Sequence, residues 1–158
     1  MKFIADRMLG SLAKLLRTLG FDTLYSNRID FKDLLKIARE KERIILTKNT
    51  LIKKKEGNYR FLFINNNDPK RQVREVITNL GLDIEPDKTF TRCLLCNNKL
   101  KKIQREDIGG KIPDYIFESY RDFSFCNKCK RIFWKGTHHE HMLTVLKEYL
   151  PRVSHKDM

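Results

Sequence analysis

KFIADRMLGSLAKLLRTLGFDTLYS, residues 2–26, contains the pattern from which the fold class follows. The apolar run at 2–5 predicts a strand. It is followed by apolar residues at helical spacing: Leu9, Leu12, Ala13, Leu15, Leu16 and Leu19. Gly20 ends this helix, and residues 23–26 predict a second short strand. A strand, a helix and a strand in succession are typical of α/β proteins.

The same alternation continues to residue 81. Asp30 is a suitable N-cap for a helix with an apolar face at 34–38. A strand is predicted at 43–47, a short helical piece around Leu51, and a strand at 60–64. The last helix of this part begins at Pro69 and ends at Gly81. We therefore expect a three-layer α/β/α domain with a mostly parallel sheet.

All four cysteines of the chain occur as two pairs, Cys93 with Cys96 and Cys126 with Cys129. The two-residue spacing within each pair predicts a tetrahedral, structural Zn²⁺ site in a small zinc ribbon. The separation of the pairs exceeds the usual ribbon loop, which predicts an inserted loop or short helix. Two disulfides are the alternative, and they are disfavoured because the chain shows no signal peptide before its first strand.

The cysteines also suggest how the chain is divided. Residues 1–80 contain neither cysteine nor histidine, so an apolar core must hold them together. We expect a first domain at 1–82, a linker at 83–90, and a zinc ribbon with a C-terminal helix at 91–158. That helix is predicted at 141–150, ended by Pro151. His138, His139 and His141 would lie in the preceding loop and first turn, since four thiolates already complete a zinc shell.

The formal net charge is +13, from 33 Lys and Arg against 20 Asp and Glu. Both halves of the chain are basic, which favours nucleic acid as the partner. A crowded solubilising surface or a lysine-rich proteome is the alternative. Basic residues beside Phe133 and Trp134 suit base stacking, although these rings could equally cover the metal site. No apolar run of membrane-spanning length occurs, so we expect a soluble, cytoplasmic protein.

Polar side chains follow three of the predicted strands. Asp6 follows the first, Asn49 the third and Asp68 the fourth, and Asp33 lies one turn into the helix after the second. The carboxyl ends of parallel strands share one edge of the sheet, so these residues are expected to converge. Carboxylates gathered there would suit Mg²⁺ or Mn²⁺ placed against phosphate. The alternative is that each residue only caps a helix or lies in its first turn.

Several segments resemble the mutator-seven carboxy-terminal RNase domain family. They are residues 6–23, ILTKN at 45–49, NDP at 67–69, both cysteine pairs and WKGTH at 134–138. The resemblance implies a PIN-like domain followed by a zinc ribbon, with a divalent-metal ribonuclease site at Asp6, Asp33, position 49 and Asp68. The family typically has aspartate at position 49, where this chain has Asn49. A neutral ligand there predicts a one-metal or impaired site.

Two functions follow from these expectations. As an endoribonuclease, the protein would hold the RNA backbone with Arg7, Lys14, Arg17 and Lys48. As a binding module with a vestigial metal site, it would dock on structured RNA or on a ribonucleoprotein such as the ribosome. A protein-interaction adaptor that uses the ribbon is a weaker third hypothesis, because both halves are basic.

Overall fold

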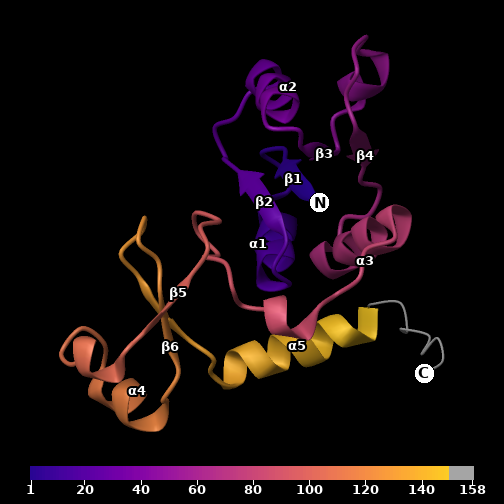
Figure 1. The fold of residues 1–158 in the computed structure, drawn as a ribbon. Coiled ribbons are helices and arrows are strands. Elements are labelled where there is room, and N and C mark those ends of the chain that lie inside the picture. The colour runs from indigo at the N-terminus through magenta and orange to yellow at the C-terminus, as the bar shows by residue number, and fades with distance from the viewer. Residues whose placement is uncertain (150–158) are drawn as a thin grey trace.

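A four-stranded parallel sheet forms the centre of the N-terminal part (Figure 1). The structure is a computed structural model that describes residues 1–149. The strands are β1 (Lys2–Ala5), β2 (Asp22–Tyr25), β3 (Ile44–Thr47) and β4 (Phe61–Phe63), in the spatial order β2-β1-β3-β4. All neighbouring pairs are parallel. The predicted α/β class and parallel sheet are confirmed.

Helices α1 (Gly10–Thr18) and α2 (Phe31–Glu40) connect the first three strands, and α3 (Pro69–Leu80) follows β4. A 3₁₀ helix at Thr50–Lys54 follows β3. The predicted helix ends are confirmed, because the Asp30 carboxylate caps α2 by accepting the Asp33 N–H, and Gly81 ends α3 with a φ of 58°. Local sequence signals therefore specify where these helices begin and end.

The sheet buries both of its faces. Along β1 the side chains alternate, so Phe3 and Ala5 pack against α1 and α3, while Ile4 packs on the opposite face against α2. β3 repeats the alternation, with Ile45 on the α2 face. Helices thus cover both faces, and the predicted three-layer arrangement is present.

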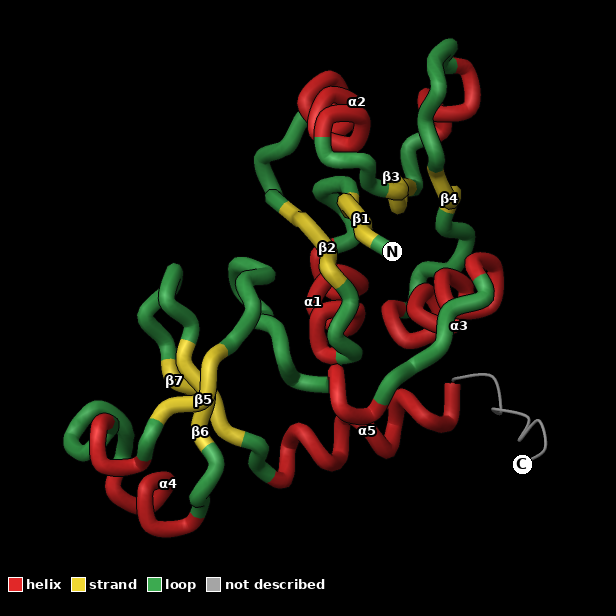
Figure 2. Tube along the Cα trace, in the orientation of Figure 1, coloured by secondary structure: helices red, strands yellow, loops and turns green. Residues whose placement is uncertain are grey.

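The C-terminal part contains a small antiparallel sheet (Figure 2). Its strands are β5 (Lys101–Ile103), β6 (Phe123–Phe125) and β7 (Ile132–Trp134), in that order. The short helix α4 (Asp114–Ser119) lies in the long segment between the cysteine pairs, where an insertion was predicted. Two single 3₁₀ turns occur at Pro86–Lys88 and Arg105–Asp107. One face of the sheet packs against Ile108 and Ile116.

The last described helix, α5 (Thr137–Tyr149), returns to the N-terminal part and lies close to α1 and α3 (Figure 1). It begins four residues before the predicted start at His141, and the predicted end at Leu150 and Pro151 lies outside the described residues. Leu146 is 1% exposed and belongs to the same apolar core as Phe3. The division into domains at 83–90 therefore stays a prediction.

Across residues 1–149, no helix combines the length and the apolar character needed to cross a membrane.

Candidate functional site

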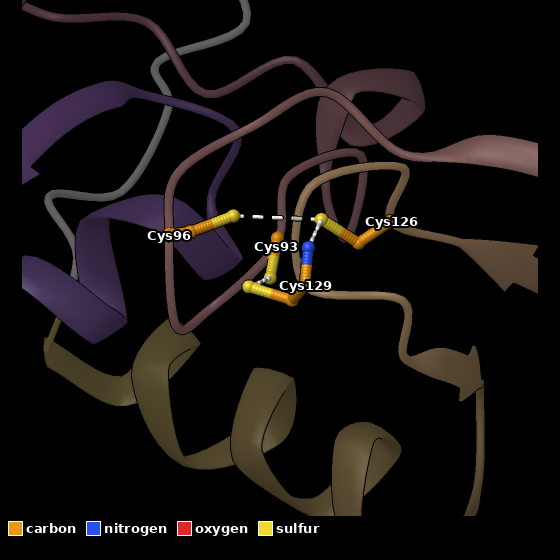
Figure 3. Close-up of side chains that lie close together, drawn as sticks. All are labelled: Cys93, Cys96, Cys126 and Cys129. Atoms are coloured by element: carbon orange, nitrogen blue, oxygen red, sulfur yellow. Dashed lines mark hydrogen bonds between the residues drawn. The ribbon is translucent and has the colours of Figure 1, made fainter.

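The four cysteines meet at one point, although they come from two segments about 30 residues apart (Figure 3). Their sulfur atoms all lie within 4.8 Å of one another. The Sγ atoms of Cys96 and Cys126 are 3.4 Å apart, and those of Cys93 and Cys129 are 4.0 Å apart. Zn–S bonds of about 2.3 Å in a tetrahedron place sulfurs roughly 3.8 Å apart, so the four thiols fit Zn²⁺.

The two cysteine turns have the same backbone geometry. In the first, Asn97 has a φ of 69° and its N–H donates to the Cys93 carbonyl at 2.9 Å. In the second, Lys130 has a φ of 58° and donates to the Cys126 carbonyl at 2.8 Å. Left-handed backbone is uncommon outside glycine. Its occurrence at the same place in both turns indicates that each is built to present two sulfurs to one ion.

The thiols differ in acidity. Burial alone would raise the pKa of Cys96, but hydrogen bonds from the Asn98 backbone and from the neighbouring thiols lower the pKa to about 7. Burial raises the pKa of Cys93, and hydrogen bonding with Cys96 raises that of Cys129 to about 12. Because zinc binds thiolates, a metal at this centre must displace the remaining protons, and its binding weakens as pH falls.

The first cysteine turn is attached to the parallel sheet. The Asn97 side chain accepts the Thr23 N–H of β2 at 3.0 Å and donates to the Asp22 carboxylate at 2.7 Å. Arg17 of α1 donates to the Leu94 carbonyl at 2.8 Å and to the Thr23 carbonyl at 2.9 Å. The metal centre is therefore continuous with the edge strand β2.

Arg17 was predicted to hold RNA, and its position corrects that prediction. The residue is 2% exposed, and its guanidinium donates to two backbone carbonyls. Burial lowers its pKa, an effect that the nearby Cys93 and Cys96 partly offset. Arg17 joins α1, β2 and the first cysteine turn, and it presents no surface to a ligand.

A cleft of about 380 Å³ opens at the carboxyl ends of β1 and β3. Asp6, Asp30 and Asn49 line it together with Arg7 and Lys48. Its apolar wall comes from the start of α2, so the cleft lies on the α2 side of the sheet. The carboxyl edge of a parallel sheet is where α/β proteins commonly bind ligands.

Asp6 is the best-positioned acid in this cleft. It is 7% exposed and accepts three hydrogen bonds: from the Thr47 hydroxyl at 2.5 Å, from the Lys48 N–H at 2.9 Å and from the Met8 N–H at 2.9 Å. These donors connect the end of β1 to the end of β3 and fix the orientation of the carboxylate.

Asn49 lies beside Asp6 in the cleft lining, but its amide oxygen already accepts a hydrogen bond. The Leu51 N–H donates to Asn49 Oδ1 at 3.0 Å, which caps the 3₁₀ helix. One lone pair of Asn49 Oδ1 is thus used by this cap, and the other is left for a cation.

The other two predicted acids do not line this cleft. Asp33 is exposed on α2, while Asp30, one turn earlier, occupies the lining. Asp68 caps α3 through the Arg71 N–H and lines a separate hollow with Lys14. Asp68 thus lines another pocket than Asp6, and α3, which it caps, packs on the face of the sheet opposite α2.

Asp30 was not predicted as a site residue. It could have been, because polar residues after the other strands were chosen on the rule that the carboxyl ends of parallel strands share one edge of the sheet. It follows β2 at the same edge of the sheet, and its role as an N-cap concealed this position.

Lys48 also differs from its predicted role. Its ammonium donates to the carbonyls of Ile64, Asn65 and Asn66 at 3.2, 3.3 and 2.9 Å. All three protons therefore hold the loop between β4 and α3 rather than facing a ligand. Of the predicted basic residues, Arg7 lines the cleft and is exposed, and Lys14 is exposed at the separate hollow.

His139 and His141 are not part of the group at the metal centre. Among the described residues, the four cysteines are the only group of three or more Cys, His, Asp or Glu within ligand reach of one another. His139 accepts the Gly136 N–H at 3.1 Å, and its ring meets Phe90 edge-on at 4.8 Å.

The chain matches the Mut7-C RNAse domain over residues 1–146. No curated protein and no solved structure matches it. The match spans both the parallel sheet with its cleft and the cysteine centre. The chain therefore belongs to the Mut7-C RNAse domain family.

Proposed function

We propose that this protein is a PIN-type endoribonuclease that acts on RNA at the cleft between β1, β3 and α2. The observation that carries the proposal is the position of Asp6, which ends a central strand, lines the cleft and is held by three hydrogen bonds. The family match over residues 1–146 supports an RNA-acting, nuclease-like role. Preorganised charge of this kind is what phosphoryl chemistry requires of a protein.

The oxygen donors fit one hard cation better than two. Asp6, Asp30 and Asn49 offer two carboxylates and a neutral amide in one cleft, whereas Asp33 and Asp68 lie outside its lining. When bound, Mg²⁺ or Mn²⁺ would activate a water molecule for attack on the phosphodiester. The chain would contribute Asp6 and Asp30 as the anionic ligands and Arg7 as the contact to phosphate.

Lys14 would extend the RNA contact along α1, since it is exposed. Arg17 and Lys48 are left out of this surface because protein carbonyls occupy both cationic groups. With a formal net charge of +13, the whole molecule favours a polyanion, and cytoplasmic RNA is the class we propose.

A binding module without cleavage is the second candidate, and Asn49 favours it. Its oxygen is used as a cap, and it contributes no charge to the cleft. In this case the protein would dock on structured RNA or on a ribonucleoprotein, of which the ribosome is one.

The test compares Asn49→Asp with Asp6→Asn on a panel of labelled RNAs in Mn²⁺. If the cleft is a working site, Asn49→Asp raises cleavage about tenfold or more, because an added anion strengthens cation binding. Asp6→Asn abolishes cleavage, while Asp33→Asn, an exposed acid outside the cleft, leaves it unchanged. Circular dichroism checks that each variant is folded.

RNA affinity, measured by fluorescence anisotropy, should change little in the three variants, since backbone contacts come from basic residues. If the natural chain and Asn49→Asp both bind RNA tightly and neither cleaves any member of the panel, the nuclease proposal fails and the binding module replaces it.

A further inference from the structure

The small antiparallel sheet has two different faces. In its register, Ile103 pairs with Phe123 and Phe123 with Trp134, and these side chains pack against the apolar cluster around Ile108. The adjacent row is Lys102, Ser124 and Phe133, which the same register puts side by side on the opposite face. This second face is not covered by the Ile108 cluster.

A cavity of about 590 Å³ lies over this second face. One wall is the row Lys102, Ser124 and Phe133, and another is the chain segment 87–94, which includes the half-buried Phe90. The edge-on contact with His139 at the start of α5 fixes the Phe90 ring. The volume falls within the range of about 300–1,000 Å³ that is usual for small-ligand sites in proteins.

The rim of this cavity is basic. Five cationic residues line it against three acidic ones: Arg92, Lys102, Arg105, Arg121 and Lys135, against Asp87, Glu106 and Asp122. Two of the cations are used within the protein, since Arg92 donates to the Gly20 and Asn97 carbonyls and Arg105 donates to the Phe117 carbonyl. Lys102, Arg121 and Lys135 are exposed, and their side chains make no hydrogen bond or ion pair within residues 1–149.

We propose that this cavity binds single-stranded RNA, with a base stacked on Phe133 and the flanking phosphates held by Lys102 and Lys135. Aromatic rings beside mobile cations are how proteins bind single strands without reading sequence. Ser124 lies between Lys102 and Phe133 in the same wall, and its hydroxyl offers a hydrogen bond to a base edge. The proposal rests on the proposed RNA-acting function and adds a second contact, away from the cleft that would cleave.

The chain carries its own reporter for this site. Trp134 is the only tryptophan, and it lines the cavity. Titration of the zinc-loaded, full-length protein with a short oligouridylate should therefore change its intrinsic fluorescence in a saturable way. Total RNA binding is followed in parallel by the anisotropy of the same oligonucleotide carrying a dye.

Two variants test the stacking and the charge separately. Phe133→Leu keeps an apolar side chain but removes the ring, and it should weaken oligouridylate binding about tenfold. Lys102→Gln should lower the slope of log K against log[salt] by about 0.7, the value for one phosphate contact on a single strand. Lys101→Gln is the matched control, because Lys101 is exposed one residue away on the other face of β5 and should change neither.

The outcomes separate this proposal from the function it rests on. A fluorescence change together with weaker binding in Phe133→Leu and Lys102→Gln supports the site. If the oligonucleotide binds by anisotropy while Trp134 fluorescence is unaffected and both variants are neutral, the cavity is not an RNA site although the protein still acts on RNA. If anisotropy detects no binding to any RNA, both proposals are overturned.

Discussion

Asp22, at the start of β2, connects the two parts of the molecule through its carboxylate oxygens. Its Oδ1 accepts hydrogen bonds from Arg43 at 2.6 Å and from Asn97 at 2.7 Å, and Arg92 lies 3.7 Å from Oδ2. Burial alone would raise the pKa of Asp22, but the hydrogen bonds from Arg43 and Asn97 outweigh it and hold the pKa below the ordinary value of 3.8. The ionised carboxylate therefore stabilises the folded chain.

Replacing Asp22 by Asn should lower the free energy of unfolding by about 1–3 kcal/mol near neutral pH, because the half-buried Arg43 and Arg92 lose a charged partner. A folded-state pKa below the unfolded one gives stability that is present above pH 3.8 and lost as pH falls through the lower value. The difference in free energy of unfolding between the natural chain and the Asp22→Asn variant should thus become smaller in strong acid. Urea unfolding across the pH range measures it, and Asp83→Asn, an exposed acid, is the control. A constant difference down to the lowest pH would contradict the assignment.

For single residues, local sequence rules predicted the helix caps but not the contacts between residues far apart in the sequence. Asp30 and Asp68 cap helices as their sequence context indicates, since a cap needs only the residues three positions further on. Arg17 has the sequence context of a surface cation. In the fold its guanidinium donates to the Leu94 carbonyl, 77 residues further along the chain. A contact over that separation cannot be predicted from the residues around Arg17.

Gly20 and Gly81 both end helices with positive φ, of 92° and 58°, but their surroundings differ. A Cβ at Gly20 would lie 2.4 Å from the backbone carbonyl oxygen of Lys88, whereas a Cβ at Gly81 would meet nothing within 4 Å. The end of α1 is thus pressed against the segment that leads to the cysteines.

Gly81→Ala should cost about 1–2 kcal/mol, the strain of left-handed backbone alone. Gly20→Ala should cost clearly more, because the Lys88 backbone has to move as well. Thermal unfolding of the two variants gives the comparison, and equal losses would mean that the close approach at Lys88 relaxes freely.

The sequence predicted the helices and strands better than it predicted how they pack together. β1 to β4 and α1 to α3 follow from apolar periodicity and from Gly and Pro, and the cysteine spacing indicated an insertion that contains α4. The position of α5 against the N-terminal core could not be predicted. The helical spacing of Leu146 indicates a buried residue, but it does not say whether that residue packs on the ribbon or in the core that contains Leu16. The acids were expected to converge, yet Asp68, the N-cap of α3, lines a separate hollow.

At the scale of the molecule, the cysteine centre and the parallel sheet are expected to be coupled in stability. Asn97 and Leu94 of the first cysteine turn bond to β2 and α1. Loss of the ion should therefore loosen β2 as well as the ribbon, since a metal site contributes its binding free energy to folding.

Hydrogen exchange of the zinc-loaded protein before and after chelation tests this coupling. The amides of β2, Thr23 among them, should lose protection by about tenfold or more, and Cys126→Ser should behave like the chelated protein. Asn127→Ala, exposed between two ligands, is the control that keeps all four sulfurs. Unchanged protection of β2 after zinc loss would show that the two parts are stable independently.

The burial of Leu146 in the same apolar core as Phe3 also affects the order in which the chain can fold during synthesis. The chain is synthesised from its N-terminus, so the sheet and its first three helices emerge before the residue that completes their core. At about 5–20 residues per second, the 64 residues between 82 and 146 take roughly 3–13 s to make. During that interval the apolar side chains of the core that α5 will cover are exposed to water, and the nascent chain can aggregate through them. Because all four cysteines precede α5 in the chain, zinc could bind before α5 is made. The cysteine segments would then already be folded, and α5 would pack on the core sooner.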